Sequence, residues 1–170
     1  MKSIIIYSSL TGNTKQVAEA IARVLPADTL CVSMSELPSD IASYDLVFAG
    51  FWVDKGTANK EASDVLGTLH NPHIALFATA GVPPQMEHAK QSLVNAAACL
   101  PEGVVPVDTF ICQGKVDPKV IEMMYKMFPK GHSHGQSADR DARHKQAAVH
   151  PNEDDCKAAS QFAKHVLDLI

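Results

Sequence analysis

Short apolar runs alternate with amphipathic segments along most of the chain. The runs that predict strands cover residues 4–7, 29–34, 45–50, 74–79 and 104–112. Apolar residues recur at helical spacing over residues 15–24, 58–69, 84–99 and 154–169. Strands that alternate with helices form parallel sheets with right-handed crossovers, so the pattern predicts an α/β fold with helices on both faces of the sheet.

Two of the predicted strands have distinctive compositions. The run at 45–50 is apolar almost throughout, as expected for a parallel strand that is covered on both faces. The run at 104–112 contains Pro106, which has no N–H to donate to a neighbouring strand. We therefore expect the first of these strands inside the sheet and the second at an edge or with a bulge.

Composition predicts one globular domain over residues 1–170. The chain is 46% hydrophobic and 20% charged, which is ordinary for a domain with a single core. No apolar run approaches the ~20 residues that span a bilayer, and no signal-like segment precedes the first strand, so we expect a cytoplasmic protein without membrane contact. The net charge of -4 argues against nucleic acid as a partner. Four scattered cysteines without a CxxC pair predict free thiols.

A polar loop joins the first strand to the first helix. It consists of Ser9, Leu10, Thr11, Gly12, Asn13 and Thr14. The first N–H groups of a helix lack intrahelical partners and carry partial positive charge, and the loop adds hydroxyl donors, so it predicts an anion site. Gly12 lets the backbone approach the anion, and Asn13 or Thr14 is expected to cap the helix.

The same loop lacks two common nucleotide-binding signatures. No Gly-Lys-Ser/Thr run is present, as a P-loop would require, and the three spaced glycines of the dinucleotide fingerprint are missing. The remaining donors suit a terminal phosphate monoester. An ordinary strand-to-helix turn with good caps is the alternative, but the run of compatible positions favours the phosphate.

The loop at 9–14 resembles the S/T-x-T-G-x-T loop with which the flavodoxin family wraps the phosphate of FMN. The resemblance covers residues 1 to about 115 and the last helix. It implies a doubly wound, five-stranded parallel sheet of order 2-1-3-4-5 with FMN as the cofactor. Ligands of such sheets lie beyond the carboxyl ends of the strands, a rule for which flavodoxins are a standard example, so the loops after the first, third and fourth strands should converge.

The loop expected after the third strand supplies candidates for contact with a flavin ring. They are Phe51, Trp52, Val53, Lys55 and Gly56. Trp52, the only tryptophan, is the first choice for stacking and Phe51 the second, and at least one of the two is expected to pack inward. Lys55 either stabilises the reduced flavin or is solvated. By resemblance to flavodoxins, a peptide flip at Gly56 would offer a carbonyl to the reduced ring.

The loop expected after the fourth strand contributes Thr79, Ala80 and Gly81. These small residues allow the backbone to approach the edge of the ring. Familiar flavodoxins carry a tyrosine and several acidic residues here, and this chain has neither. The departure weakens the prediction of a standard electron shuttle and leaves the prediction of FMN binding intact.

An insertion at about 117–152 interrupts the passage from the fifth strand to the last helix. Residues 118–127 are expected to be helical and to be followed by a polar loop, and the insertion as a whole to act as a lid or docking surface. Four of the eight histidines lie here, namely His132, His134, His144 and His150. Their spacing does not match a closed metal site, so no metal is predicted.

The function predicted from these features is electron transfer. In the first hypothesis the chain holds FMN and passes electrons from a reductase to a redox partner, without catalytic side chains. In the second it is an FMN-dependent NAD(P)H reductase of quinones or similar small acceptors. A flavin-free protein on the same fold is a third possibility. Residues 50–57, 110–116 and the insertion also resemble a bacterial flavodoxin-like subgroup that is associated with a bilirubin reductase.

Overall fold

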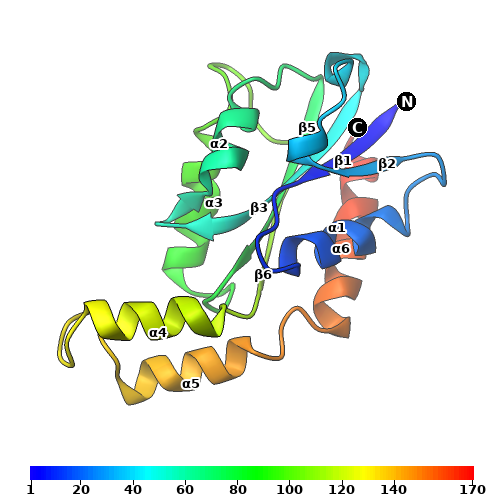
Figure 1. Ribbon diagram of the computed structural model, residues 1–170. Coiled ribbons are helices and arrows are strands. Elements are labelled where there is room, and N and C mark those ends of the chain that lie inside the picture. Colours follow the sequence, from blue (N-terminus) through cyan, green and yellow to red (C-terminus); the bar gives the residue numbers. More distant parts are fainter.

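The computed structural model describes residues 1–170 and contains one main parallel sheet (Figure 1). Its strands run in the order β2-β1-β3-β5-β6. Their bounds are β1 Ser3–Tyr7, β2 Leu30–Ser33, β3 Leu46–Asp54, β5 His73–Ala80 and β6 Thr109–Gln113. The predicted order of five parallel strands is therefore confirmed. A short strand, β4 (Thr57–Ala58), pairs antiparallel with the end of β3 and was not predicted.

Helices cover both faces of the sheet, as expected (Figure 1). The helices are α1 Asn13–Ala22, α2 Lys60–Leu66, α3 Glu87–Ala97, α4 Pro118–Met127, α5 Ala138–Ala147 and α6 Glu153–Leu169, with short 3-10 turns at Met34–Glu36 and Ile41–Ser43. Helices α1 and α6 pack together on one face, and α2 and α3 cover the other. None of these helices combines the length and apolarity needed to cross a membrane.

The central strand β1 shows why the sheet needs both layers. Ile4, Ile5 and Ile6 are all fully buried. Because successive side chains of a strand point to opposite faces, Ile4 and Ile6 join the core on the α2 and α3 side, and Ile5 joins the core on the α1 and α6 side. Burial of each such side chain contributes ~1.5–3 kcal/mol, so the apolar run holds the two layers together.

Strand β3 is longer than the sequence pattern predicted. It continues past Gly50 to Asp54, turns through Lys55 and Gly56, and pairs back through β4. Both turn residues have positive φ, 50° and 78°, which suits a two-residue hairpin turn. The segment that the apolar run predicted as a loop is therefore mostly strand.

Strand β6 is shorter than predicted and begins at Thr109. Before it, Val107 donates from its N–H to the Ile74 carbonyl, while Pro106 cannot donate at all. The Asp108 carbonyl accepts from the N–H of Leu76, so this segment already pairs with β5 before the regular register begins at Thr109.

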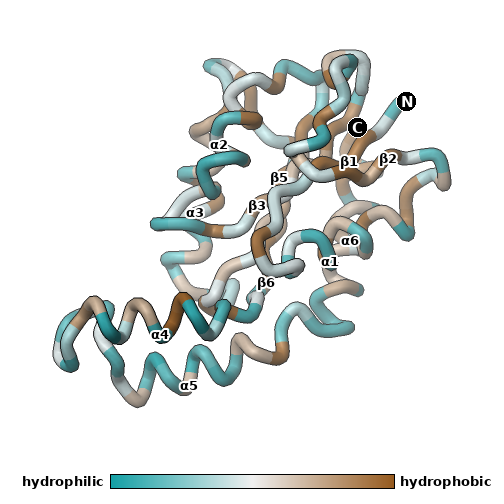
Figure 2. Tube along the Cα trace, in the orientation of Figure 1, coloured by the Kyte–Doolittle hydropathy of each residue, from teal (hydrophilic) through white to brown (hydrophobic).

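The insertion forms a helical hairpin of α4 and α5 beyond the end of β6 (Figure 1). The helix expected at 118–127 is confirmed as α4, but the expected polar loop contains a second helix, α5. Figure 2 shows that α5 is hydrophilic over most of its length. Among its residues only Ala147 is fully buried, so the apolar periodicity that normally indicates a helix is nearly absent.

The sequence of the hairpin does contain N-cap residues at the start of both helices. The carboxylate of Asp117 accepts from the N–H of Lys119 at 2.8 Å, and the hydroxyl of Ser137 accepts from the N–H of Arg140 at 3.2 Å. Both are preferred N-cap residue types, because their side chains satisfy a free N–H of the first turn.

Candidate functional site

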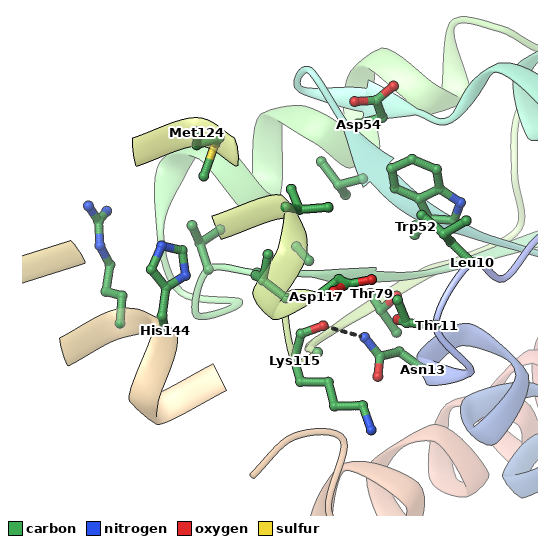
Figure 3. A pocket seen from close by; sticks show the side chains of 18 of the residues that line it. Leu10, Thr11, Asn13, Trp52, Asp54, Thr79, Lys115, Asp117, Met124 and His144 are labelled. Carbon is green, nitrogen blue, oxygen red and sulfur yellow. Dashed lines mark hydrogen bonds between the residues drawn. The ribbon is translucent and has the colours of Figure 1, made fainter. Parts of the chain in front are cut away.

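A pocket of about 470 Å³ opens at the carboxyl edge of the sheet (Figure 3). The segments after β1, β3, β5 and β6 line it together with the helical hairpin. Eight of the residues predicted as binding residues line this pocket: Leu10, Thr11, Asn13, Trp52, Val53, Thr79, Ala80 and Gly81. The structure thus brings the three loops together in one place.

The Ser9 side chain fixes the backbone of the loop after β1. The Ser9 hydroxyl oxygen accepts from the N–H of Gly12 at 3.1 Å and from the N–H of Lys15 at 3.3 Å. Gly12 has a φ of 90° and is the N-cap of α1, with no side-chain cap. The expectation that Asn13 or Thr14 caps the helix is therefore wrong, because the left-handed glycine takes that position and both residues lie inside the helix.

Asn13 connects this loop to the segment after β6. Its side-chain amide donates to the Lys115 carbonyl at 2.8 Å, which Figure 3 marks with a dashed line. A Cβ at Gly114 would lie 2.7 Å from the Asn13 amide nitrogen, so glycine is needed where the two segments cross. Asn13 therefore fixes the loop after β1 against the segment after β6.

Thr14 lies behind the pocket, and its hydroxyl contacts that of Thr79 at 2.9 Å. Thr14 is 1% exposed and Thr79 2% exposed, so each hydroxyl satisfies the other away from water. This pair ties the first turn of α1 to the end of β5. Thr14 therefore positions the loop, whereas Thr11 is exposed and lines the pocket.

Substitutions at the two threonines should separate these roles. Thr14→Ala leaves the buried Thr79 hydroxyl without its partner and should lower the free energy of unfolding by ~1–3 kcal/mol. Thr11→Ala should change it by less than ~0.5 kcal/mol, because Thr11 is exposed. Urea unfolding of the two variants checks the difference, and equal losses would contradict the assignment.

Ser8 supports the loop from below, although it was not among the predicted residues. Its hydroxyl is buried, donates to the Glu61 carboxylate and accepts from the Asn59 side-chain amide at 2.8 Å. Both partners belong to the start of α2, far along the chain. No local pattern could have identified this network, because it exists only once β1 and α2 are packed together.

The two aromatic candidates on β3 face different surroundings. Phe51 is fully buried in the core, and Trp52 is half-buried and lines the pocket. Because β3 continues through this segment, neighbouring side chains alternate in direction. This corrects the placement of Phe51 as a ring-facing candidate and leaves Trp52 in that position.

Lys55 and Gly56 do not line the pocket either. They form the β3–β4 turn, where Lys55 is exposed and the Gly56 carbonyl accepts from the Asn95 side-chain amide at 2.8 Å. This corrects their expected position beside the ring, because the extended strand carries the turn past the pocket. Lys55 is solvated, which was one of the two alternatives for it.

The pocket also has walls that the sequence did not assign to it. From the strand ends and the segments after them come Asp54, Val82, Gly114, Lys115, Val116 and Asp117, from the start of α3 Met86 and His88, and from the hairpin Val120, Met124, His134, Arg140, Arg143 and His144. The insertion was expected to be a lid or docking surface, and the structure makes it one end of the cavity. No group of three or more His, Cys, Asp or Glu side chains is arranged to hold a metal ion.

His144 is an unusual member of the hairpin wall, because both of its ring nitrogens are buried without a hydrogen-bond partner. Its ring lies 6.0 Å from that of Tyr125 on α4. Burial and the Arg140 guanidinium lower the pKa of His144 below its usual value of 6.5, with a further lowering from Arg143 and an opposing effect of Asp141. The imidazole is therefore neutral at neutral pH.

This lowered pKa predicts a loss of stability in acid. The unfolded chain binds a proton at His144 more readily than the folded chain does, so stability that is present above about pH 6.5 is lost as the pH falls through the folded-state pKa. Urea unfolding at pH 7.5 and pH 5.0 should show a larger loss for the parent than for His144→Gln. Equal losses would show that His144 does not contribute.

Comparison with known proteins agrees with this geometry. A family model described as a flavodoxin domain matches residues 4–164. The chain is also 34% identical over 174 residues to the flavodoxin-like domain-containing protein BilS of Clostridioides difficile, with 98% of this chain and 97% of the relative covered. The chain belongs to the flavodoxin family. The flavodoxin resemblance found in the sequence is thereby confirmed. The bacterial flavodoxin-like subgroup that the sequence also resembles is the one that contains BilS.

Solved structures show that flavodoxins share this fold. Oxidised flavodoxin 2 from Bacillus cereus matches with a TM-score of 0.59 at 16% identity, over the whole of both chains. A flavoprotein in complex with FMN from Lactobacillus acidophilus matches with a TM-score of 0.51 at 17% identity, over 65% of this chain and 93% of that one.

Family membership indicates FMN as the cofactor, and the residues of this flavodoxin fit it. In the loop at 9–14 the N–H groups of Asn13 and Thr14 have no acceptor within the chain, and the left-handed Gly12 has no atom within 4 Å of its Cβ position. The pocket has the size of a small-molecule site, and Trp52 offers it a planar apolar wall. The site therefore has a place for a phosphate and a place for a ring.

Proposed function

We propose that this flavodoxin binds FMN and transfers electrons between a reductase and an acceptor protein. The loop at 9–14 carries the proposal, because the first-turn N–H groups of Asn13 and Thr14 have no acceptor within the chain and lie at the edge of a pocket of suitable size. When bound, FMN supplies the redox chemistry. The chain supplies binding, orientation and exclusion of water.

In this proposal the phosphate lies at loop 9–14 and the ring reaches toward Trp52. Thr11 donates its hydroxyl to the phosphate, and the N–H groups of the first turn of α1 complete the seat. Thr79, Ala80 and Gly81 form the wall that approaches the edge of the ring. The tie between Thr14 and Thr79 then fixes the distance between the phosphate seat and this wall.

Anaerobic mixing with reduced nicotinamides tests the carrier role. The FMN-loaded protein should keep its visible flavin absorbance with NADH or NADPH alone and should lose it after a flavodoxin reductase is added. A BilS-type resemblance makes a bilirubin reductase the first acceptor to test, and reduced protein should support its turnover. Rapid bleaching by NADPH without a reductase would contradict the carrier role.

The second candidate is an FMN-dependent NAD(P)H reductase of small acceptors. One observation favours it, namely that the pocket continues past the proposed ring position into the hairpin, where Arg140 and Arg143 lie. Steady-state oxidation of NADPH by the FMN-loaded protein with a quinone would support this candidate.

Trp52→Ala should change the flavin signal without removing the flavin. Loss of the stacked indole should increase the fluorescence of bound FMN and shift its reduction potential, while the phosphate seat keeps most of the affinity. Flavin fluorescence and a spectroelectrochemical titration measure the two quantities. Phe51→Leu is a control for the neighbouring aromatic, because Phe51 lies in the core and should affect stability instead. If neither signal moves in Trp52→Ala, the ring does not face Trp52.

A further inference from the structure

The pocket has two chemically different ends. Figure 3 shows Leu10, Thr11 and Trp52 at one end and Met124 and His144 at the other. The first end is the proposed flavin site. The second end belongs to the α4–α5 hairpin, and no part of the proposed electron transfer explains its residues.

On the polar wall of the hairpin end, the Arg143 guanidinium has no hydrogen-bond partner. Arg140 already donates to the Ser133 carbonyl at 2.7 Å and lies 3.4 Å from a ring nitrogen of His134. The Arg143 side chain is half-buried, and its guanidinium makes no hydrogen bond or ion pair within the chain. Because Arg143 lies on the pocket wall, its guanidinium N–H groups are available to a ligand in the cavity.

The acidic side chains near the Arg143 guanidinium bind to other groups. The Asp141 carboxylate accepts from the Tyr125 hydroxyl at 2.9 Å and from the Gln136 amide at 3.1 Å. The carboxylates on the pocket wall are Asp54 and Asp117, and Asp117 caps α4. None of these carboxylates forms an ion pair with Arg143, which lies next to His144 in the sequence.

The opposite wall is apolar. Val116, Val120 and Met124 line the pocket across from the polar residues of α5. A guanidinium presents two parallel N–H groups that match a carboxylate. A ligand that satisfies both walls has one carboxylate and a planar or flexible apolar body.

We propose that the hairpin end of the pocket binds a small organic carboxylate through Arg143, with its apolar body against Val120 and Met124. The proposal rests on the proposed function only in placing FMN at the other end. It assigns the insertion a role in binding a second ligand beside the flavin, which a carrier that contacts only proteins would not need.

A matched pair of probes tests the charge requirement. Isothermal titration of the FMN-loaded chain with 2-naphthoate and with its neutral isostere 2-naphthamide should give at least about tenfold tighter binding of the carboxylate. Arg143→Gln should remove this preference and Arg143→Lys should restore part of it. Equal affinities of the two probes for the parent chain would overturn the proposal.

Lys130→Gln is the control variant, because it removes the same charge from the exposed tip of the hairpin outside the pocket. It should change naphthoate binding by less than about twofold, since exposed charges are screened. An effect equal to that of Arg143→Gln would show that naphthoate binding depends only on the overall charge of the hairpin, and would overturn the proposal. The ring resonances of His144, assigned with His144→Gln, should shift with naphthoate, and no shift would place the ligand elsewhere and overturn it.

Flavin binding must be measured separately in the same variants. Arg143→Gln should keep the FMN affinity of the parent, and a joint loss of FMN would assign Arg143 to the flavin site and overturn the proposal. If the chain takes up no FMN but still prefers naphthoate, the proposed function fails and this inference stands. If NADPH displaces naphthoate and itself binds in an Arg143-dependent way, the hairpin end is a nucleotide site, and the carboxylate assignment is wrong.

Discussion

Riboflavin is expected to bind this protein about a thousandfold more weakly than FMN. The two ligands differ only in the phosphate, and the loop at 9–14 offers the exposed Thr11 hydroxyl and the N–H groups of Asn13 and Thr14, which have no acceptor within the chain. Loss of about three charge-assisted hydrogen bonds at ~1.5 kcal/mol each weakens binding by ~4–5 kcal/mol, or roughly three powers of ten in Kd. Quenching of flavin fluorescence gives both constants.

The same titration on Thr11→Ala provides the control. The variant should lose FMN affinity by ~1–3 kcal/mol and keep its affinity for riboflavin, because the Thr11 hydroxyl acts on the phosphate alone. The ratio of the two constants therefore falls in the variant. Equal affinity of the parent for both flavins would show that the loop recognises no anion and would remove the basis of the proposed function.

Gly50→Ala is expected to be the most destabilising of the substitutions considered, with a loss of ~3 kcal/mol or more in the free energy of unfolding. Gly50 pairs with Phe77 across β3 and β5, and the Phe77 ring lies over it. A Cβ at Gly50 would come within 2.1 Å of a Phe77 ring atom. Phe77 is fully buried, so the ring cannot move aside without disturbing the core.

Gly67→Ala is the matched control for this prediction. It lies at the C-terminal end of α2 with an ordinary helical φ of -62°, and a Cβ there would have its nearest neighbours at 3.6 Å. Thermal or urea unfolding should show a change within ~0.5 kcal/mol for Gly67→Ala. Similar stabilities of the two variants would mean that Phe77 does not pack over Gly50.

The loop at 9–14 could be predicted because its chemistry is local. A strand, a polar loop with glycine and a helix follow one another directly, so the helix N-terminus and its donors lie next to each other in the sequence. Even here the details of capping were decided by the fold. Asn13 and Thr14 look like cap residues, but their side chains bond to Lys115 after β6 and to Thr79 at the end of β5.

The aromatic wall shows how a small error in an element boundary changes a site. The apolar run predicted the end of β3 at Gly50, and both Phe51 and Trp52 then appear to belong to a loop. The strand continues to Asp54 because β4 pairs with it, and alternation sends Phe51 into the core and leaves Trp52 on the pocket. When the end of a strand depends on pairing with a later segment, the residues of the strand alone do not predict where it ends.

Taken by itself, the sequence determined the α/β layering and the position of the proposed anion seat, because these depend on periodicity or on neighbouring residues, and it gave the strand order through its family resemblance. Only the tertiary structure decided that α5 is a helix and that Arg143 and His144 face the same cavity as Trp52. Helix α5 buries almost no apolar surface, so no hydrophobic period marks it. Its part in the site follows from long-range packing of the insertion against the strand ends, which no local pattern encodes.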